Sequence, residues 1–170
     1  MTSASRRKRV DLARIALVAL DFDGVMTDNR VLVDQNGREA VWCNRADGLG
    51  VEMLKSEGLR VIVISTETNH VVSARCRKLR IPCIRSSRDK LTALRGVMAK
   101  WGLRAEQVAF VGNDINDLEC LRVVGVPVAP CDAVPAVRRV VRLVTKARGG
   151  AGVVRELADR VQAARRRVGK

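Results

Sequence analysis

The chain has 170 residues, of which 47% are hydrophobic and 29% are charged, a composition typical of one globular domain rather than of a disordered chain. Its formal net charge of +14 raises nucleic-acid binding as a hypothesis, but aromatic residues make up only 2% of the chain, too few to stack against bases. We interpret the charge instead as solvated basic ends, residues 6–9 and 165–167, which also attract anionic substrates.

Neither a membrane segment nor a disulfide framework is predicted. No apolar run approaches membrane-spanning length, and no signal-peptide core follows the basic N-terminus. The five cysteines are odd in number and include no Cys-x-x-Cys pair. We therefore expect a cytoplasmic protein with reduced thiols, without structural disulfides or zinc.

The chain begins with residues 1–10, which we expect to be a disordered basic arm. Residues 11–165 are predicted to form a single domain, and residues 166–170 a basic tail. Within the domain, the apolar run at residues 15–20 has the length and composition of a strand buried on both faces.

Two carboxylates follow this first predicted strand. Along extended backbone Asp21 and Asp23 point the same way, so their charges need a cation or a proton between them to lie close together. Gly24 then allows a sharp turn. An isolated Asp-x-Asp-Gly is most often a plain turn or part of a calcium loop, but such a loop would need Glu at its twelfth position, where Leu32 stands.

A β-hairpin is predicted directly after this turn. Residues 30–34 and 38–43 are β-prone and flank Asn36-Gly37, which is a strong hairpin signal. We expect a small flap beside the two aspartates.

Helices and strands alternate along the rest of the chain. Helices are predicted at residues 47–58, 68–79, 87–101, 133–140 and 153–165, with a short one ending at residue 124, and strands at residues 59–64, 83–84, 108–111, 126–128 and 141–144. This alternation predicts an α/β fold, a doubly wound, Rossmann-like parallel sheet.

Polar side chains follow several of these strands at their carboxyl ends, which meet at one edge of a parallel sheet. They are Asp21, Asp23, Ser65, Lys90 at the head of a helix, Asn113, Asp114 and Asp117. Taken singly, Ser65 would be an ordinary strand-end residue and Lys90 a solvated residue at a helix start. Asp114 and Asp117 would be helix caps. Taken together, acid groups for a hard cation, a hydroxyl and an ammonium are typical of phosphoryl transfer.

This order of residues resembles the four motifs of the haloacid dehalogenase superfamily over almost the whole chain. The resemblance implies that Asp21 is a nucleophile that forms a phosphoaspartyl intermediate and that Asp23 is the general acid and base. It implies that Ser65 and Lys90 hold the phosphoryl oxygens. It also implies a Mg²⁺ ion, with ligands or orienting groups at Asp21, Asp23, Asn113, Asp114 and Asp117.

One position departs from the superfamily pattern. The family usually has aspartate directly after the glycine of its fourth motif, where this chain has Asn113. An amide oxygen can ligate Mg²⁺ but carries no charge, so we expect a lower metal affinity or activity unless Asp114 takes over.

Within the superfamily the chain resembles the 3-deoxy-octulosonate 8-phosphate and nonulosonate 9-phosphate phosphatases, because it has only the hairpin and no room for a large cap domain. Residues 149–156 (Gly-Gly-Ala-Gly-Val-Val-Arg-Glu) and Asn44 with Asp47-Gly48 carry this resemblance. It implies a homotetramer in which a neighbouring subunit covers the site.

Two features favour the nine-carbon branch. Glu67 and Ala46 stand where the octulosonate enzymes usually or often carry arginine, and residues 112–121 resemble the domain fused behind some acylneuraminate cytidylyltransferases. The resemblance implies substrate contacts from Asn44, Ser65, Thr66, Glu67, Arg75 and Lys78, with Arg75 and Lys78 coming from a neighbouring subunit.

The sequence therefore predicts a Mg²⁺-dependent phosphomonoester hydrolase that acts on a phosphorylated acidic keto-deoxy sugar, with nonulosonate 9-phosphate favoured over octulosonate 8-phosphate. The alternative is a catalytically weak oligomerisation or regulatory module related to the C-terminal domain of acylneuraminate cytidylyltransferases, and Asn113 is the residue that favours it.

Overall fold

The apolar run near the N-terminus forms the centre of a sheet. It folds as β1 (Leu17–Leu20), which is completely buried. Val18 and Leu20 point into one apolar core, whereas Leu17 and Ala19 point into a second, because alternate side chains of a strand face opposite ways. The composition of this strand is thus explained by a place between two cores, where neither face meets water.

Six parallel strands make the main sheet of the computed structural model, which describes residues 10–169. They are β1 (Leu17–Leu20), β4 (Arg60–Ile64), β5 (Cys83–Ile84), β6 (Val108–Val111), β7 (Val126–Ala129) and β8 (Leu143–Val144). Their spatial order is β5-β4-β1-β6-β7-β8, which confirms the predicted doubly wound sheet. The carboxyl ends of β1, β4 and β6 consequently lie at one edge.

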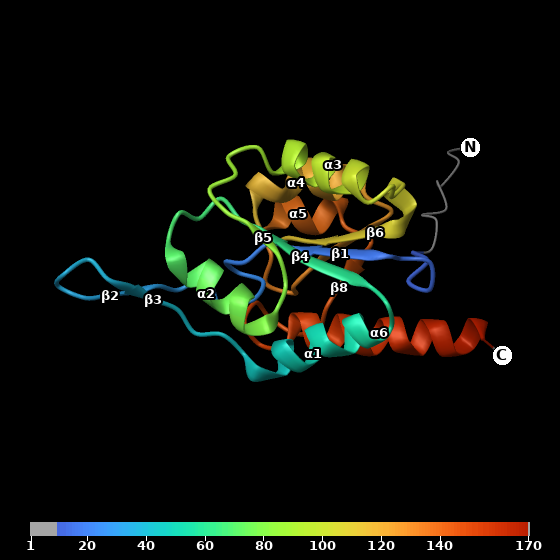
Figure 1. The fold of residues 1–170 in the computed structure, drawn as a ribbon, viewed down its shortest axis with the longest axis horizontal. Helices are drawn as coiled ribbons and strands as arrows, with labels where there is room; N and C mark the ends of the chain where they lie inside the picture. The colour runs from blue at the N-terminus through green and yellow to red at the C-terminus, as the bar shows by residue number, and fades with distance from the viewer. Residues whose placement is uncertain (1–9, 170) are drawn as a thin grey trace.

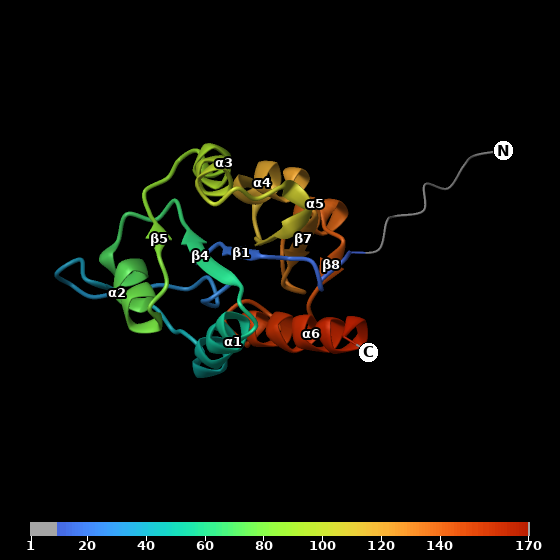
Figure 2. The ribbon, with the colours of Figure 1, turned by 45° about the vertical axis from the view of Figure 1, so that its right-hand side comes forward.

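Helices cover both faces of the sheet (Figure 1). One face carries α1 (Arg45–Ser56), α2 (His70–Leu79) and α6 (Val153–Val168), and the other carries α3 (Lys90–Lys100), α4 (Leu118–Val123) and α5 (Pro135–Val140). Two 3-10 turns, η1 (Ala105–Gln107) and η2 (Ile115–Asp117), lie before and after β6. Helices α1 and α6 lie side by side in both views and are in close contact (Figure 2).

The predicted hairpin is present as β2 (Leu32–Val33) and β3 (Glu39–Ala40), joined through Asn36-Gly37. Gly37 adopts φ 73°, a left-handed value that suits glycine in a tight turn. We call residues 30–43 the flap, and it extends away from the body of the molecule (Figure 1). Four of its apolar side chains are exposed to solvent, namely Val31, Leu32, Val33 and Trp42, the last by 77%.

Several helix boundaries differ by one to three residues from those predicted, among them the starts of α1, α2 and α5. Helix α3 begins at Lys90 rather than Ser87, because Asp89 is its N-cap. Helix α6 continues to Val168, three residues past the predicted end, so part of the predicted basic tail is helical. The predicted basic arm lies outside the described residues except for its last member, Val10.

Within residues 10–169, no helix is long and apolar enough to cross a membrane. The five cysteines, all among these residues, are free thiols in the structure.

Candidate active site

Three segments that are far apart in the chain meet at the carboxyl edge of the sheet. Asp21 follows β1 directly, Asn113 lies two residues after β6, and Lys90 is the first residue of α3. The N–H of Asp21 donates to the carbonyl of Val111 (2.9 Å), which continues the pairing of β1 with β6 up to the site. The structure thus brings together residues that the sequence predicted to share one site.

Lys90 is buried between two carboxylates. Its Nζ donates to Oδ1 of Asp21 and to Oδ1 of Asp117, both at 2.7 Å, and the residue is only 2% exposed. Burial lowers the pKa of Lys90, but the two carboxylates outweigh burial, so the pKa is raised and the ammonium stays charged. Asp89 accepts a hydrogen bond from the N–H of Thr92 (2.8 Å) and thereby fixes the start of α3.

Asp21 holds its proton more tightly than an ordinary aspartate. Burial, and next the charge of Asp117, raise the pKa of Asp21 to about 7, while Lys90 acts in the opposite direction. A cation beside Asp21 would favour the ionised carboxylate, because it would offset the charge that burial penalises.

The carboxyl group of Asp23 is oriented by a buried hydroxyl. Thr27 Oγ1 donates to Asp23 Oδ1 (3.4 Å) and accepts from the N–H of Gly24 (3.2 Å). Burial, and next the negative charge of Glu67, raise the pKa of Asp23. A raised pKa favours the protonated form, which a general acid requires.

Residues 23–28 form a tight turn that we call the Asp23 loop. The carbonyl of Phe22 accepts from the N–H groups of Val25 (3.3 Å) and Met26 (2.8 Å). Gly24 adopts φ 79°, and a Cβ at this position would collide with the side chain of Asn113. Glycine is therefore required here both for the backbone angle and for the close approach.

Three oxygen atoms converge beside this loop. In one amide orientation the side-chain oxygen of Asn113 lies 2.9 Å from the carbonyl oxygen of Asp23 and 3.2 Å from Asp21 Oδ2. The edge of an octahedron of oxygens around Mg²⁺ is about 3 Å when the Mg–O bonds are about 2.1 Å. With the amide turned round, its nitrogen donates to the same two oxygens instead. These oxygens therefore fit a cation the size of Mg²⁺.

The donor set also suits Mg²⁺ in kind. Within residues 10–169, no group of three or more His, Cys, Asp or Glu side chains is arranged to hold a metal ion. The converging donors are one carboxylate, one backbone carbonyl and one amide oxygen. Mg²⁺ binds oxygen, takes few protein ligands and keeps several waters, whereas Zn²⁺ prefers nitrogen and sulfur.

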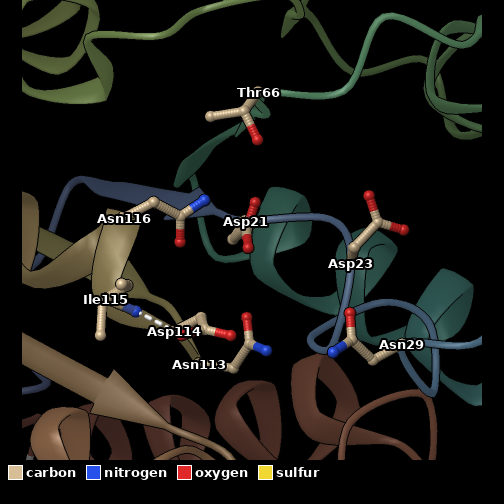
Figure 3. A pocket seen from close by; sticks show the side chains of 8 residues that line it. All are labelled: Asp21, Asp23, Asn29, Thr66, Asn113, Asp114, Ile115 and Asn116. Carbon is tan, nitrogen blue, oxygen red and sulfur yellow. Dashed lines mark hydrogen bonds between the residues drawn. The ribbon is translucent and has the colours of Figure 1, made fainter.

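These groups open into a pocket of about 340 Å³ (Figure 3). Its lining residues are Asp21, Asp23, Asn29, Thr66, Asn113, Asp114, Ile115 and Asn116. In Figure 3 the side chain of Thr66 lies across the pocket from Asn113, with the carboxylate of Asp21 between them. A wall made mainly of polar groups suits a phosphoryl group better than an apolar ligand.

A second pocket of about 310 Å³ adjoins the first, and Asp23, Asn29 and Thr66 line both. Its other walls come from the flap and the start of α2, and they are Arg30, Val31, Glu39, Val41, Glu67 and Val71. The charges of this lining are mostly negative, and Arg30 is already paired with Asp28 at 2.7 Å.

One hydrogen bond ties the flap to α2 beside this second pocket. Asn69, the N-cap of α2, donates from Nδ2 to Glu39 Oε2 (2.7 Å) and accepts at Oδ1 from Val71 (3.0 Å). Glu67 Oε1 in turn accepts from the N–H of Asn69 (2.9 Å). The two glutamates are thus held on the same wall.

Two of the predicted metal-site residues occupy different environments. Asp114 lines the pocket, and its Oδ1 accepts from the N–H of Ile115 (2.7 Å). Asp117 does not line the pocket, because Lys90 occupies Oδ1 and the N–H groups of Asn113 (2.9 Å) and Asp114 (3.2 Å) occupy Oδ2. Asp117 therefore orients the lysine and the loop after β6.

Four predicted substrate contacts lie outside both pocket linings. Ser65 is buried, and its Oγ accepts from the N–H of Glu67 (3.0 Å). Asn44 caps α1, and its carbonyl accepts from Arg75 Nη2 (3.0 Å). Lys78 is exposed on α2. Within one chain, Arg75 and Lys78 therefore lie outside the two pockets.

Four residues of the site were not predicted from the sequence. Thr27 orients Asp23, and Asn29, Ile115 and Asn116 line the pocket. Asn29 adopts φ 65°, which asparagine tolerates, so Asp28-Asn29 carried a turn signal. No sequence signal marks Asn116.

Comparisons with known proteins agree with this site. A model of haloacid dehalogenase-like hydrolases matches residues 64–157. The 3-deoxy-D-manno-octulosonate 8-phosphate phosphatase KdsC of Escherichia coli (strain K12) is 34% identical over 146 residues, which span 85% of this chain and 78% of that enzyme.

Solved structures agree as well. A Streptomyces avermitilis protein, solved as a candidate HAD family hydrolase, is 47% identical with a TM-score of 0.84, over 86% of this chain and 84% of its own. The 3-deoxy-D-manno-octulosonate 8-phosphate phosphatase of Moraxella catarrhalis, solved with a magnesium ion, a phosphate ion and KDO, is 30% identical with a TM-score of 0.89, over 94% and 92%. The predicted superfamily is confirmed: this chain belongs to the haloacid dehalogenase-like hydrolases, and it is an enzyme of that family.

Proposed function

We propose that the protein is a Mg²⁺-dependent phosphomonoester hydrolase that acts on a phosphorylated acidic keto-deoxy sugar through a phosphoaspartyl intermediate. One observation carries this proposal: the buried contact of Lys90 with Asp21 lies beside the oxygens that converge from Asp23 and Asn113. A carboxylate nucleophile, a fixed ammonium and an oxygen-lined cation site are the parts that phosphoryl transfer needs.

In the first step the carboxylate of Asp21 bonds to phosphorus while the P–O ester bond breaks, and Asp23 gives its proton to the departing alcohol. In the second step Asp23 takes a proton from a water molecule, which attacks phosphorus and releases phosphate and free Asp21. Lys90 offsets the negative charge of Asp21 throughout. Mg²⁺, held by Asp21, Asp23 and Asn113, would neutralise the charge of the phosphoryl group when bound.

Further predicted residues have supporting roles in this proposal. Ser65 and Thr66, at the end of β4, would hold phosphoryl oxygens, and Thr66 already faces the pocket (Figure 3). Asp114 would act as a further ligand or bind a metal-bound water, and Asp117 would orient Lys90.

The second pocket suits the sugar part of the substrate, because it adjoins Asp23. Its carboxylates would repel a sugar acid in a single chain, so we propose that a neighbouring copy supplies cations through Lys78 and Arg75. Lys78 is exposed and free to do so, whereas Arg75 would first have to leave the carbonyl of Asn44.

The exposed apolar side chains of the flap support a homotetramer. The flap exposes Val31, Leu32, Val33 and Trp42 by 53%, 67%, 54% and 77%. An apolar surface of this kind is typical of a protein–protein contact, and a neighbouring copy would cover it and the site beside it.

The free thiols of the five cysteines support a reducing compartment, the cytoplasm.

The substrate preference depends on Glu67. The relatives from Escherichia coli and Moraxella catarrhalis are phosphatases of 3-deoxy-D-manno-octulosonate 8-phosphate, which makes this compound the reference substrate. We propose that a nonulosonate 9-phosphate is hydrolysed faster, because its longer hydroxylated chain can donate hydrogen bonds to the Glu67 carboxylate on the pocket wall.

The experiment measures phosphate release with Mg²⁺ from octulosonate 8-phosphate, a nonulosonate 9-phosphate and a neutral hexose 6-phosphate. We expect both sugar acids to be hydrolysed faster than the neutral sugar, and Asp21→Asn to lose at least about 10³-fold in kcat. Asp159→Asn, which removes an exposed carboxylate on α6, is the matched control. Equal rates for wild type and Asp21→Asn on every substrate would reject the proposal.

A catalytically weak oligomerisation or regulatory module is the second candidate, and Asn113 favours it because the amide contributes no charge to the cation site. It predicts only slow hydrolysis by wild type together with tight binding to an acylneuraminate cytidylyltransferase.

A further inference from the structure

We propose that Asp47, in the first turn of α1, is a positioning residue for the proposed reaction: it holds the N-terminus of α6 and, through the turn at Gly149–Gly150, keeps the Asp23 loop in place. The inference concerns how Asp23 is aimed, and it rests on the proposed role of Asp23 in proton transfer.

Asp47 caps a helix that cannot cap itself. Its Oδ1 accepts from the N–H groups of Val154 (2.8 Å) and Arg155 (3.1 Å), and the residue is only 1% exposed. The residue at the N-cap of α6 is Gly152, with φ 101° and no side chain to serve as a cap. The first turn of α6 thus depends on a carboxylate from 107 residues earlier in the chain.

The two helices are in contact at the same point. One turn after Asp47, a Cβ at Gly50 would lie 2.7 Å from the N and Cα atoms of Arg155. The backbones of α1 and α6 are therefore as close as glycine allows, and a shift of the α6 N-terminus would break this packing as well as the cap.

The segment just before α6 lies directly against the Asp23 loop. The N–H of Gly150 donates to the carbonyl of Val25 (3.0 Å), and a Cβ at Gly149 would collide with the carbonyl of Gly24. A Cβ at Gly150 would lie 2.6 Å from the carbonyl carbon of Thr27. The two backbone segments thus touch along the length of the loop.

Thr27 passes this contact on to Asp23. It is fully buried, and its hydroxyl binds both Asp23 Oδ1 and the N–H of Gly24. If the Gly149–Gly150 turn retreats, Thr27 loses its backbone support and the carboxyl of Asp23 loses its fixed direction. Asp47 contacts neither substrate nor reacting atoms, so it acts through this chain of contacts alone.

The second carboxylate oxygen of Asp47, Oδ2, is buried without a hydrogen-bond partner. The carboxylate is therefore held by the two hydrogen bonds of Oδ1 to α6. Asparagine at this position keeps an oxygen for the two N–H groups, whereas alanine removes the cap.

The test compares kcat/KM for an alkyl phosphate and an aryl phosphate. Departure of the alkoxide needs the proton of Asp23, whereas a phenolate leaves without full protonation, so a misdirected Asp23 slows the alkyl ester selectively. We expect Asp47→Ala and Gly149→Ala to lower the alkyl-to-aryl ratio by about tenfold or more, and Asp47→Asn to keep it within about threefold.

The control is Val161→Ala, which removes buried volume from α6 two turns beyond the cap and destabilises the same helix contact. Its melting temperature should fall at least as far as that of Asp47→Ala while the ratio stays within about threefold. An unchanged ratio in Asp47→Ala and Gly149→Ala, or an equal fall in Val161→Ala, would overturn the inference.

Hydrogen exchange separates this inference from the proposed function. If wild type hydrolyses neither ester, the proposed function fails, and the amides of residues 23–28 still report on the loop. We expect them to exchange at least about tenfold faster in Asp47→Ala than in Val161→Ala. Equal exchange in the two variants would refute the positioning role whatever the activity.

Discussion

Lys90→Met removes the ammonium between Asp21 and Asp117 while keeping most of the volume of the side chain. Both contacts are 2.7 Å long, and an effective dielectric constant of about 20 gives roughly 6 kcal/mol of attraction for each before the desolvation of the lysine is subtracted. Removing one partner of a buried ion pair lowers the free energy of unfolding by about 3–5 kcal/mol net, and we expect this value for Lys90→Met at pH 8.

The loss of unfolding free energy in Lys90→Met should be larger at high pH than at low pH. Without Lys90, the pKa of Asp21, already raised to about 7 by burial and by Asp117, rises further. A carboxyl whose folded pKa lies above its unfolded pKa favours the native state as the pH falls toward the unfolded value, because the native state then holds the proton more tightly. The difference between the variant and wild type should therefore be smaller at pH 5 than at pH 8.

Urea unfolding followed by circular dichroism, in EDTA at both pH values, measures the free energy, and phosphate release with Mg²⁺ measures activity. Lys100→Met, at the exposed far end of the same helix, is the matched control and should change stability by no more than about 0.5 kcal/mol. A free energy of unfolding for Lys90→Met within about 1 kcal/mol of wild type at pH 8, or wild-type activity, would contradict this role of Lys90.

The other predictions concern the metal site, the Asp23 loop and α6. Mg²⁺ at 100 times its Kd should stabilise the protein by about 2.7 kcal/mol in thermal unfolding. Because the pKa of Asp21 is about 7 without metal, calorimetry at pH 6.5 should detect release of about three-quarters of a proton on binding, and none in Asp21→Asn. Asn113→Asp adds a charged oxygen and should tighten Mg²⁺ binding by about tenfold, and weaker binding would contradict the assignment. Gly24→Ala forces φ 79° on an L residue and displaces Asn113. It should lower the free energy of unfolding by about 1–2 kcal/mol and weaken Mg²⁺ binding. The control is Gly58→Ala, with φ 76° and open space around the Cβ, which should lower stability without affecting Mg²⁺ binding. Burial raises the pKa of Glu156, but hydrogen bonds from Ala147 and Lys146 lower it overall. Glu156→Gln should therefore be less stable than wild type by about 1–2 kcal/mol at pH 7, and this difference should shrink as the pH falls below the ordinary glutamate pKa of 4.5 and through the lower folded pKa.

The order of strands and helices was predictable because apolar runs and turn residues are local signals. The run before Asp21, the Asn36-Gly37 turn and the alternation after it are confirmed as β1, the flap and a parallel sheet. The meeting of Asp21, Lys90 and Asn113 was also predictable, since parallel strands place their carboxyl ends together.

Contacts that depend on the direction of a side chain were not predictable. Asp117 resembled a metal ligand, but both of its oxygens are taken by Lys90 and backbone N–H groups. Asp47 resembled an acidic residue in the first turn of its own helix, yet it caps α6 instead. Neither outcome has a local signal, because each depends on a partner brought near by the tertiary fold.

The distances along the chain between the partners of the site determine when it can form. Asp21 meets Lys90 across 69 residues, and Asp47 meets Val154 across 107, so these contacts close large loops. During synthesis the nucleophile emerges early, but it stays unpaired until α3 and the segment after β6 have left the ribosome. The high contact order of such a topology predicts slow folding, with the site forming only after these large loops have closed.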